Sequence, residues 1–93
     1  MALFAVEYAY TDASSKDRDE VRPEHRAWLS GLVDQGAVRS SGPYPDGSGA
    51  LIIVEADDAA AVTARMAEDP FAKSGLIENV RVNEWAPVFG TFA

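Results

Sequence analysis

The segment ALIIVEA, at residues 50–56, is the part of the chain around which the predicted fold is organised. Its β-branched and apolar residues predict a buried central strand. The turn residues Pro45-Asp46-Gly47-Ser48-Gly49 come directly before it. A shorter strand over residues 37–41, which ends at Gly42-Pro43, precedes this turn. The two strands and the turn between them predict a β-hairpin.

The N-terminal part predicts a strand followed by a helix. Residues 2–10 carry two largely apolar rows, which is typical of a central strand buried on both faces. Residues 11–20 are polar and predict a loop or an early helical turn. Pro23 is well placed as the first residue of a helix, and Gly36 as the residue that ends it. The apolar face of this helix comprises His25, Trp28, Leu29, Leu32 and Val33.

The C-terminal part predicts a second helix and a last strand. Asp57 or Asp58 caps a helix over residues 59–67, and Asp69-Pro70 ends it. Residues 70–74 form one further turn, closed by Gly75, and residues 76–87 form the strand. The order β-α-β-β-α-β is the α+β, ferredoxin-like arrangement, with a four-stranded antiparallel sheet and helices on one face. We expect residues 1–93 to form a single domain.

The face of the sheet without helices needs a partner, because the strand at residues 50–56 is apolar on both faces. A second copy of the chain is the simplest partner for such a face. The sequence therefore predicts a homodimer in which two sheets stack face to face.

Composition narrows the class of function. The formal net charge is -7, from 15 acidic and 8 basic residues, which argues against nucleic acid and anionic membrane surfaces as partners. With no cysteine and one histidine, neither disulfides nor a metal site is expected. Residues 1–10 do not resemble a signal peptide, and no apolar run approaches the ~20 residues of a membrane span. These features predict a soluble, cytoplasmic protein.

The predicted topology brings polar residues to one rim of the fold. The first helix starts, the short strand ends and the second helix ends at the same end of the sheet. His25, the corner at Ser41, Gly42 and Pro43, and Asp69 should therefore lie together. Asp34 is excluded as a partner of His25 within one subunit, because it lies about 13 Å further along the same helix at 1.5 Å per residue.

The chemistry expected at this rim is proton transfer. Histidine is the side chain whose ordinary pKa lies near neutrality. A helix start disfavours the imidazolium of His25 and the Asp69 carboxylate favours it, a balance suited to an acid–base group. Asp69 would orient the ring, Ser41 and nearby backbone N–H groups would hold a substrate oxygen, and Arg22 would attract an anionic or phenolate substrate.

The motifs Arg22-Pro23-x-His25, Gly36, Ser41-Gly42-Pro43 and Asp69-Pro70-Phe71, with Gly75-Leu76 after them, resemble those of the YciI-like (YCII-related) proteins. The resemblance covers residues 2–90. It implies a dimeric α+β barrel with a His-Asp pair in a pocket and cofactor-free chemistry of the lyase or isomerase type. One branch resembles dehydrochlorinases of chlorinated hydroxyquinones, and the wider fold superfamily includes muconolactone isomerases and cofactor-free monooxygenases. The resemblance therefore implies an aromatic or lactone substrate. The implied site has His25 and Asp69 as catalytic residues, and Arg22, Ser41, Gly42, Pro43 and Phe71 around the substrate.

Each site residue also has a structural explanation. His25 could be a hydrogen-bonded core residue, and Asp69 a helix cap before a proline. The Ser41 corner could end an edge strand, Arg22 could be solvated, and Phe71 could belong to the core. The alternative functions are a non-catalytic small-molecule binding or accessory module and an interaction domain. Glu7 is left open as a pocket residue or a partner across the dimer.

Overall fold

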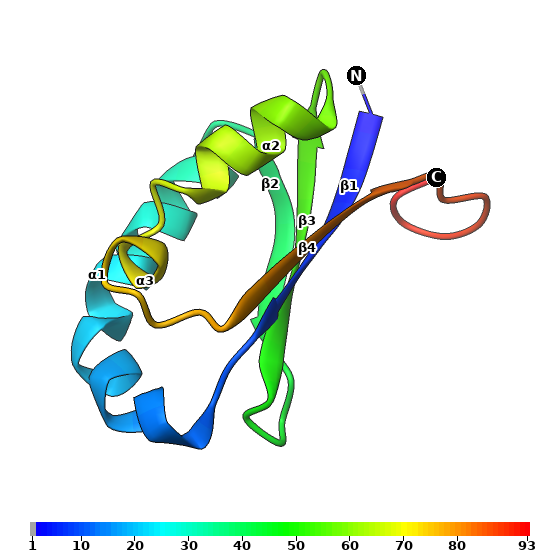
Figure 1. Ribbon diagram of the computed structural model, residues 1–93. Helices are drawn as coiled ribbons and strands as arrows, with labels where there is room; N and C mark the ends of the chain where they lie inside the picture. The colour runs from blue at the N-terminus through cyan, green and yellow to red at the C-terminus, as the bar shows by residue number, and fades with distance from the viewer. Residues whose placement is uncertain (1) are drawn as a thin grey trace.

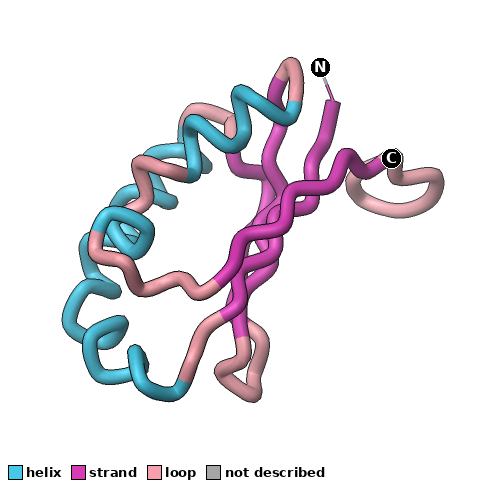
Figure 2. The backbone as a smooth tube through the Cα atoms, viewed as in Figure 1, coloured by secondary structure: helices cyan, strands magenta, loops and turns pink. Residues whose placement is uncertain are grey.

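The computed structural model describes residues 2–93. Three helices lie on one face of a four-stranded sheet, and the other face is bare (Figures 1 and 2). The elements in chain order are β1 (Ala2–Ala9), a 3-10 turn η1 (Asp12–Ser14), α1 (Ser15–Asp34), β2 (Val38–Pro43), β3 (Gly49–Ala56), α2 (Ala59–Met66), α3 (Pro70–Lys73) and β4 (Asn79–Trp85).

The sheet has the strand order β2-β3-β1-β4, and each neighbouring pair is antiparallel. This order confirms the predicted ferredoxin-like arrangement. In the middle of the sheet Val6 pairs with Ile52 on one side and with Val82 on the other. Side chains alternate between the two faces along a strand, and residues that pair directly across strands point to the same face. These three apolar residues therefore all face the helices. Val6 and Ile52 are completely buried.

The hydrophobic core lies between this face of the sheet and the helices. Burying each large apolar side chain stabilises the fold by about 1.5–3 kcal/mol, which makes this layer the main source of stability. Val62 and Met66 of α2 point inward, as the sequence predicted. The buried core residues from the sheet are Phe4, Val6, Tyr8, Val38, Ala50, Ile52 and Val54.

Helix α1 begins earlier than predicted. It starts at Ser15, and Pro23 lies inside it, so the prediction that Pro23 is its first residue is wrong. The polar segment before Pro23 is anchored by Arg18, which is 5% exposed and donates from Nη1 to the Thr11 carbonyl at 2.9 Å. The arginine stem covers apolar surface while its head is hydrogen-bonded, a combination that a polar stretch of sequence does not reveal.

The remaining boundaries differ from the predicted ones by a few residues. Strand β2 continues through Gly42 and Pro43, which pair with Leu51 and Ala50 of β3. A proline is tolerated there because β2 is an edge strand, whose outer side has no neighbouring strand among residues 2–93. Asp58 caps α2 by accepting from the backbone N–H of Ala61. Strand β4 is shorter than the predicted strand over residues 76–87.

Apolar side chains remain exposed on the bare face of the sheet and in the C-terminal tail. Leu51 is 38% exposed and Trp85 is 40% exposed. In the tail, which projects from the body in Figure 1, Phe89 is 92% exposed. Among residues 2–93, no helix combines the length and the apolar character needed to cross a membrane.

Candidate functional site

Asp69 is a completely buried carboxylate, with an exposed fraction of 0%. It stands between α2 and α3 and caps α3, since its Oδ1 accepts from the backbone N–H of Phe71 at 2.9 Å. The same Oδ1 is 2.7 Å from Nδ1 of His25, and Oδ2 accepts from the Tyr8 hydroxyl at 2.7 Å. A buried charge is costly unless it is hydrogen-bonded, and these three donors supply that compensation.

His25 is held from two sides. Its ring nitrogen Nδ1 meets Asp69, and its face stacks on the ring of Phe71, with centroids 3.9 Å apart and planes 2° apart. Because the carboxylate only accepts hydrogen bonds, Nδ1 of His25 carries a proton in this pair. The other nitrogen, Nε2, has no hydrogen-bond partner among residues 2–93 and is available to a bound molecule.

His25 lies well inside α1, which begins at Ser15. The prediction that a helix start disfavours its imidazolium is therefore wrong, because the helix macrodipole acts mainly within the first and last turns. The geometry leaves Asp69 as the charged group in contact with the ring.

Tyr8 completes the arrangement and was not predicted as a site residue. It lies on β1 and is 1% exposed. Burial, and then the neighbouring Asp69 carboxylate, raise the pKa of the Tyr8 phenol far above its usual range. Tyr8 therefore stays protonated and donates to Asp69. The signal in the sequence was a tyrosine in the inward-facing row of a central strand, since a buried hydroxyl needs a partner.

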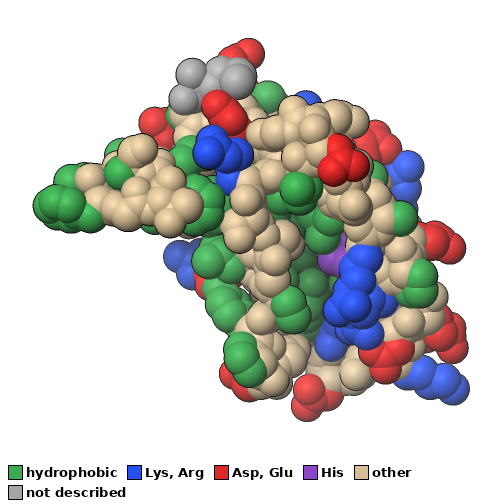
Figure 3. All heavy atoms as spheres, turned by 180° about the vertical axis from the view of Figure 1, so that it is seen from behind, with side chains coloured by type: hydrophobic (Ala, Val, Ile, Leu, Met, Phe, Trp, Pro, Cys, Tyr) green, Lys and Arg blue, Asp and Glu red, His purple; other side chains and the backbone are tan. Residues whose placement is uncertain are grey.

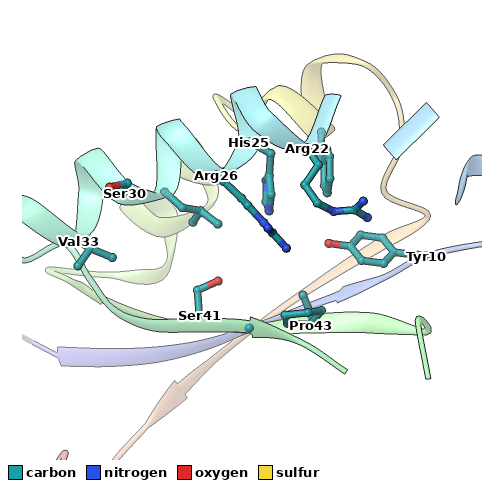
Figure 4. A pocket seen from close by; sticks show the side chains of 12 residues that line it. Tyr10, Arg22, His25, Arg26, Ser30, Val33, Ser41 and Pro43 are labelled. Atoms are coloured by element: carbon teal, nitrogen blue, oxygen red, sulfur yellow. The ribbon is translucent and has the colours of Figure 1, made fainter. Parts of the chain in front are cut away.

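A cavity of about 400 Å³ opens beside His25, between α1 and the end of β2 (Figure 4). Its lining combines polar and apolar side chains. The polar lining residues are Tyr10, Arg22, His25, Arg26, Ser30 and Ser41. The others are Leu29, Val33, Gly42, Pro43, Ala50 and Phe71.

The structure brings the residues singled out from the sequence together. Arg22, His25 and Phe71 line the cavity from the helical side, and the corner formed by Ser41, Gly42 and Pro43 lines it from β2. Asp69 lies behind His25 and does not line the cavity. Its cap and its contact with His25 use the same oxygen, so the two explanations of this residue hold at once.

Glu7 does not line the cavity. On the bare face of the sheet its carboxylate accepts from the Tyr44 hydroxyl, and it lies 3.4 Å from Nη1 of Arg81. Both partners belong to the same chain. Glu7 is therefore not a residue of this cavity, and within one chain its charge has two partners.

Tyr10 and Arg26 are cavity residues that the sequence did not indicate. Burial, and then the charge of Asp69, raise the pKa of Tyr10 to about 12, so its hydroxyl is a hydrogen-bond donor at neutral pH. The guanidinium of Arg18 lies 4.2 Å from the centre of the Tyr10 ring and holds it in place. Figure 4 shows the Tyr10 oxygen and the Arg26 guanidinium pointing into the cavity from opposite sides.

Metal ligation was not expected from the sequence. Within residues 2–93, no three side chains of the types His, Cys, Asp and Glu are grouped so that they could hold a metal ion.

Known proteins resemble this chain along nearly its whole length. Protein YciI of Escherichia coli O6:H1 and Protein YciI of Shigella flexneri are each 33% identical to it, over 94% of this chain and 100% of theirs. A solved structure, the 5-chloro-2-hydroxyhydroquinone dehydrochlorinase of Burkholderia phenoliruptrix AC1100 in complex with 2,5-dihydroxybenzoquinone, matches with a TM-score of 0.80. Its sequence is 26% identical, and the match covers 90% of this chain and 93% of that one. The family model of the YCII-related domain matches residues 2–86, and the chain therefore belongs to the YciI-like, YCII-related family.

Proposed function

We propose that this protein is a small-molecule enzyme of the lyase or isomerase type in which His25 transfers a proton. The observation that carries the proposal is the pair formed by His25 and the completely buried Asp69, with 2.7 Å between Nδ1 and Oδ1. The pair fixes one ring nitrogen and leaves the other for a molecule in the adjacent cavity.

The proposed step begins with Nε2 of His25 removing a proton from the bound molecule. The imidazolium that forms keeps its Nδ1–H bond to Asp69, and the carboxylate stabilises the new positive charge. The Ser41 hydroxyl, and backbone N–H groups on the free edge of β2, would hold the substrate oxygen on which negative charge develops. The proton then returns at another atom in an isomerisation, or a leaving group departs with the electron pair in an elimination.

The substrate we propose is a small aromatic, quinone-like or lactone molecule. The flat ring of Phe71 and the apolar groups of Leu29, Val33 and Pro43 support this choice, because they offer apolar surface beside the imidazole. The dehydrochlorinase with the similar fold carries 2,5-dihydroxybenzoquinone in its structure, which supports the same size of ligand here.

The direct test follows proton exchange in heavy water. A panel of phenols, quinones and lactones is incubated with the protein, and deuterium incorporation or elimination is followed by NMR. We expect turnover of at least one member, and His25→Gln should lower its rate about 10²–10⁴-fold. Asp69→Asn keeps the shape of the buried group but removes its charge, and should also lower the rate.

The alternative is a binding or accessory module that uses the same cavity without chemistry. The cavity and the exposed apolar residues described above are compatible with this function. Its signature is a ligand that binds to wild type and to His25→Gln with equal affinity and shows no exchange with either. That outcome would refute proton transfer by His25.

We further infer a homodimer through the bare face of the sheet. Leu51 and Trp85 support this, since each leaves more than a third of its surface in water. Light scattering should give twice the chain mass for wild type, and Leu51→Glu should lower it to one chain. A monomeric wild type at micromolar concentration would contradict the inference.

A further inference from the structure

The ionisable side chains that line the cavity are all basic or phenolic. Arg22, Arg26 and His25 line it together with Tyr10, and no aspartate or glutamate among residues 2–93 does so. The whole chain has a formal net charge of -7, so a cavity without carboxylates is an exception on this molecule. Figure 3 shows the histidine at the base of a hollow, with Lys or Arg side chains along one side and apolar ones along the other.

The two arginines differ in how their charge is compensated. Arg22 donates from Nη1 to Asp19, so part of its charge is already balanced. Arg26 has neither an ion pair nor a side-chain hydrogen bond among residues 2–93, although it comes from the same face of α1 one turn later. In Figure 4 its side chain reaches from α1 into the cavity. An arginine that faces a cavity without a carboxylate can bind an anion without first losing a partner.

The neutral polar groups of the cavity are hydrogen-bond donors. Tyr10 keeps its proton at neutral pH because of the burial and charge described above. The Ser41 hydroxyl faces α1 from β2 in Figure 4. The two guanidinium groups and the hydroxyls of Tyr10 and Ser41 around a partly apolar cavity suit a ligand with oxygen atoms that carry negative charge, since each donor then makes a charge-assisted hydrogen bond.

We propose that this cavity selects planar organic anions, carboxylates or phenolates, and that Arg26 is the residue that determines this selectivity. The inference rests on the proposed function, since it names the charge of the substrate that reaches His25. Arg26 binds the anionic oxygen, Arg22 adds a second positive charge, and the ring of the ligand lies against the apolar wall. His25 is left free to act on an atom elsewhere in the ligand.

The test compares two probes of nearly equal size, benzoate and its neutral isostere benzamide. Both are titrated into the full-length protein, and the shifts of backbone and His25 signals are followed by NMR. Benzoate should bind at least about tenfold more tightly than benzamide, because a hydrogen bond to a charged group contributes more than a neutral one. Equal affinities, or no binding of benzoate up to its solubility, would overturn the proposal.

Two variants separate local recognition from overall charge. Arg26→Gln should abolish the preference for benzoate. Arg65→Gln, at an exposed position on α2 outside the cavity and without an ion pair to any of residues 2–93, removes the same charge and should leave the preference unchanged. A loss of the preference in both variants would also contradict the proposal, because it would reflect the overall charge of the chain.

Different experimental results would refute the proposed function and this inference. Benzoate selectivity that depends on Arg26, with no proton exchange in any substrate, would contradict the enzyme and support the anion site. Turnover that depends on His25, with equal affinity for benzoate and benzamide, would support the enzyme and contradict the anion site. Sulfate serves as the competitor that has charge but no ring. If it displaced benzoate at equal concentration, the apolar wall would have no part in recognition.

Discussion

The imidazole of His25 lies flat on the ring of Phe71, with the two planes 2° apart and the centroids 3.9 Å apart. Phe71 also donates its backbone N–H to the oxygen of Asp69 that meets His25. The short helix α3 therefore supplies the surface under the imidazole, and its N-cap residue Asp69 supplies the carboxylate at the edge of the ring. The position of the ring depends on this helix as much as on α1.

Replacing Phe71 with a smaller, non-aromatic side chain should make the imidazole of His25 more mobile. Phe71→Leu removes the flat contact from a side chain that is 2% exposed, and we expect it to destabilise the fold by about 1–2 kcal/mol. The His25 ring signals in NMR should broaden because the imidazole is held at one edge only. Phe92→Leu, in the C-terminal tail, is the matched control and should leave the His25 signals unchanged. Sharp signals in Phe71→Leu would argue against a positioning role.

Removing the hydroxyl of Tyr8 should lower the free energy of unfolding by more than the small size of this group suggests. Tyr8→Phe leaves Oδ2 of Asp69 buried without its donor, and an unsatisfied group of this kind costs about 1–3 kcal/mol. Urea denaturation measures the loss. Tyr44→Phe removes a hydroxyl that bonds Glu7, a carboxylate that keeps Arg81 beside it at 3.4 Å, and should lower stability less. Equal losses in the two variants would contradict the account of the buried carboxylate.

Stability should fall steeply in alkali. The pKa of Tyr8 is raised far above the usual value of about 10, and that of Tyr10 is raised to about 12. Between about pH 10 and pH 12 the unfolded chain loses these phenolic protons while the folded chain keeps them, so the free energy of unfolding decreases as the pH rises. Below pH 10 both states keep the protons and this stabilisation is complete.

The variant Tyr8→Phe tests whether Tyr8 causes the decrease in the free energy of unfolding at alkaline pH. It removes one of the two groups and should reduce the slope between pH 10 and pH 12 by up to about 1.4 kcal/mol per pH unit, the value for one proton. Urea denaturation at several pH values gives the slope. An identical slope in wild type and variant would show that Tyr8 does not stay protonated in the folded protein.

Replacing each of two glycines with alanine should change the stability of the protein in opposite directions. A Cβ on Gly49 would lie 1.9 Å from the carbonyl oxygen of Tyr8, so Gly49→Ala forces β1 and β3 apart and should cost about 3 kcal/mol. A Cβ on Gly31, inside α1, meets nothing within 4 Å, and Gly31→Ala should stabilise the protein by about 0.5–1 kcal/mol. The melting temperatures of both variants measure these effects. A large loss in Gly49→Ala alone would support the register in which Gly49 of β3 lies against β1.

The sheet and its order could be predicted because the sequence signals are strong. The apolar rows of residues 2–10 and 50–56 left few alternatives to central strands, and the turn residues Asp69-Pro70 fixed where α2 ends. The start of α1 could not be predicted, since its first turns carry no apolar face. Their anchor is Arg18, whose buried position depends on Tyr10 and Thr11, residues outside the helix.

The contact between His25 and Asp69 followed from topology alone, because the fold brings the two elements to one rim. Tyr8 and Arg26 could not be found in this way. Tyr8 looked like one more core residue in an apolar strand, and Arg26 like one more solvated charge on a helix. Only the three-dimensional arrangement shows that one hydroxyl reaches a buried carboxylate and one guanidinium faces a cavity. The cytoplasmic location and the single-domain organisation stay predictions of the sequence.

The most direct test of the central claim is the tautomer of the single histidine, measured by long-range ¹H–¹⁵N NMR on the wild-type protein. No substrate is needed, and only one imidazole gives signals. At a pH where the ring is neutral, we expect a proton on Nδ1, bonded to Asp69, and a bare Nε2 available to the cavity. A proton on Nε2 with a bare Nδ1 would contradict the His25–Asp69 hydrogen bond and the proton-transfer role built on it.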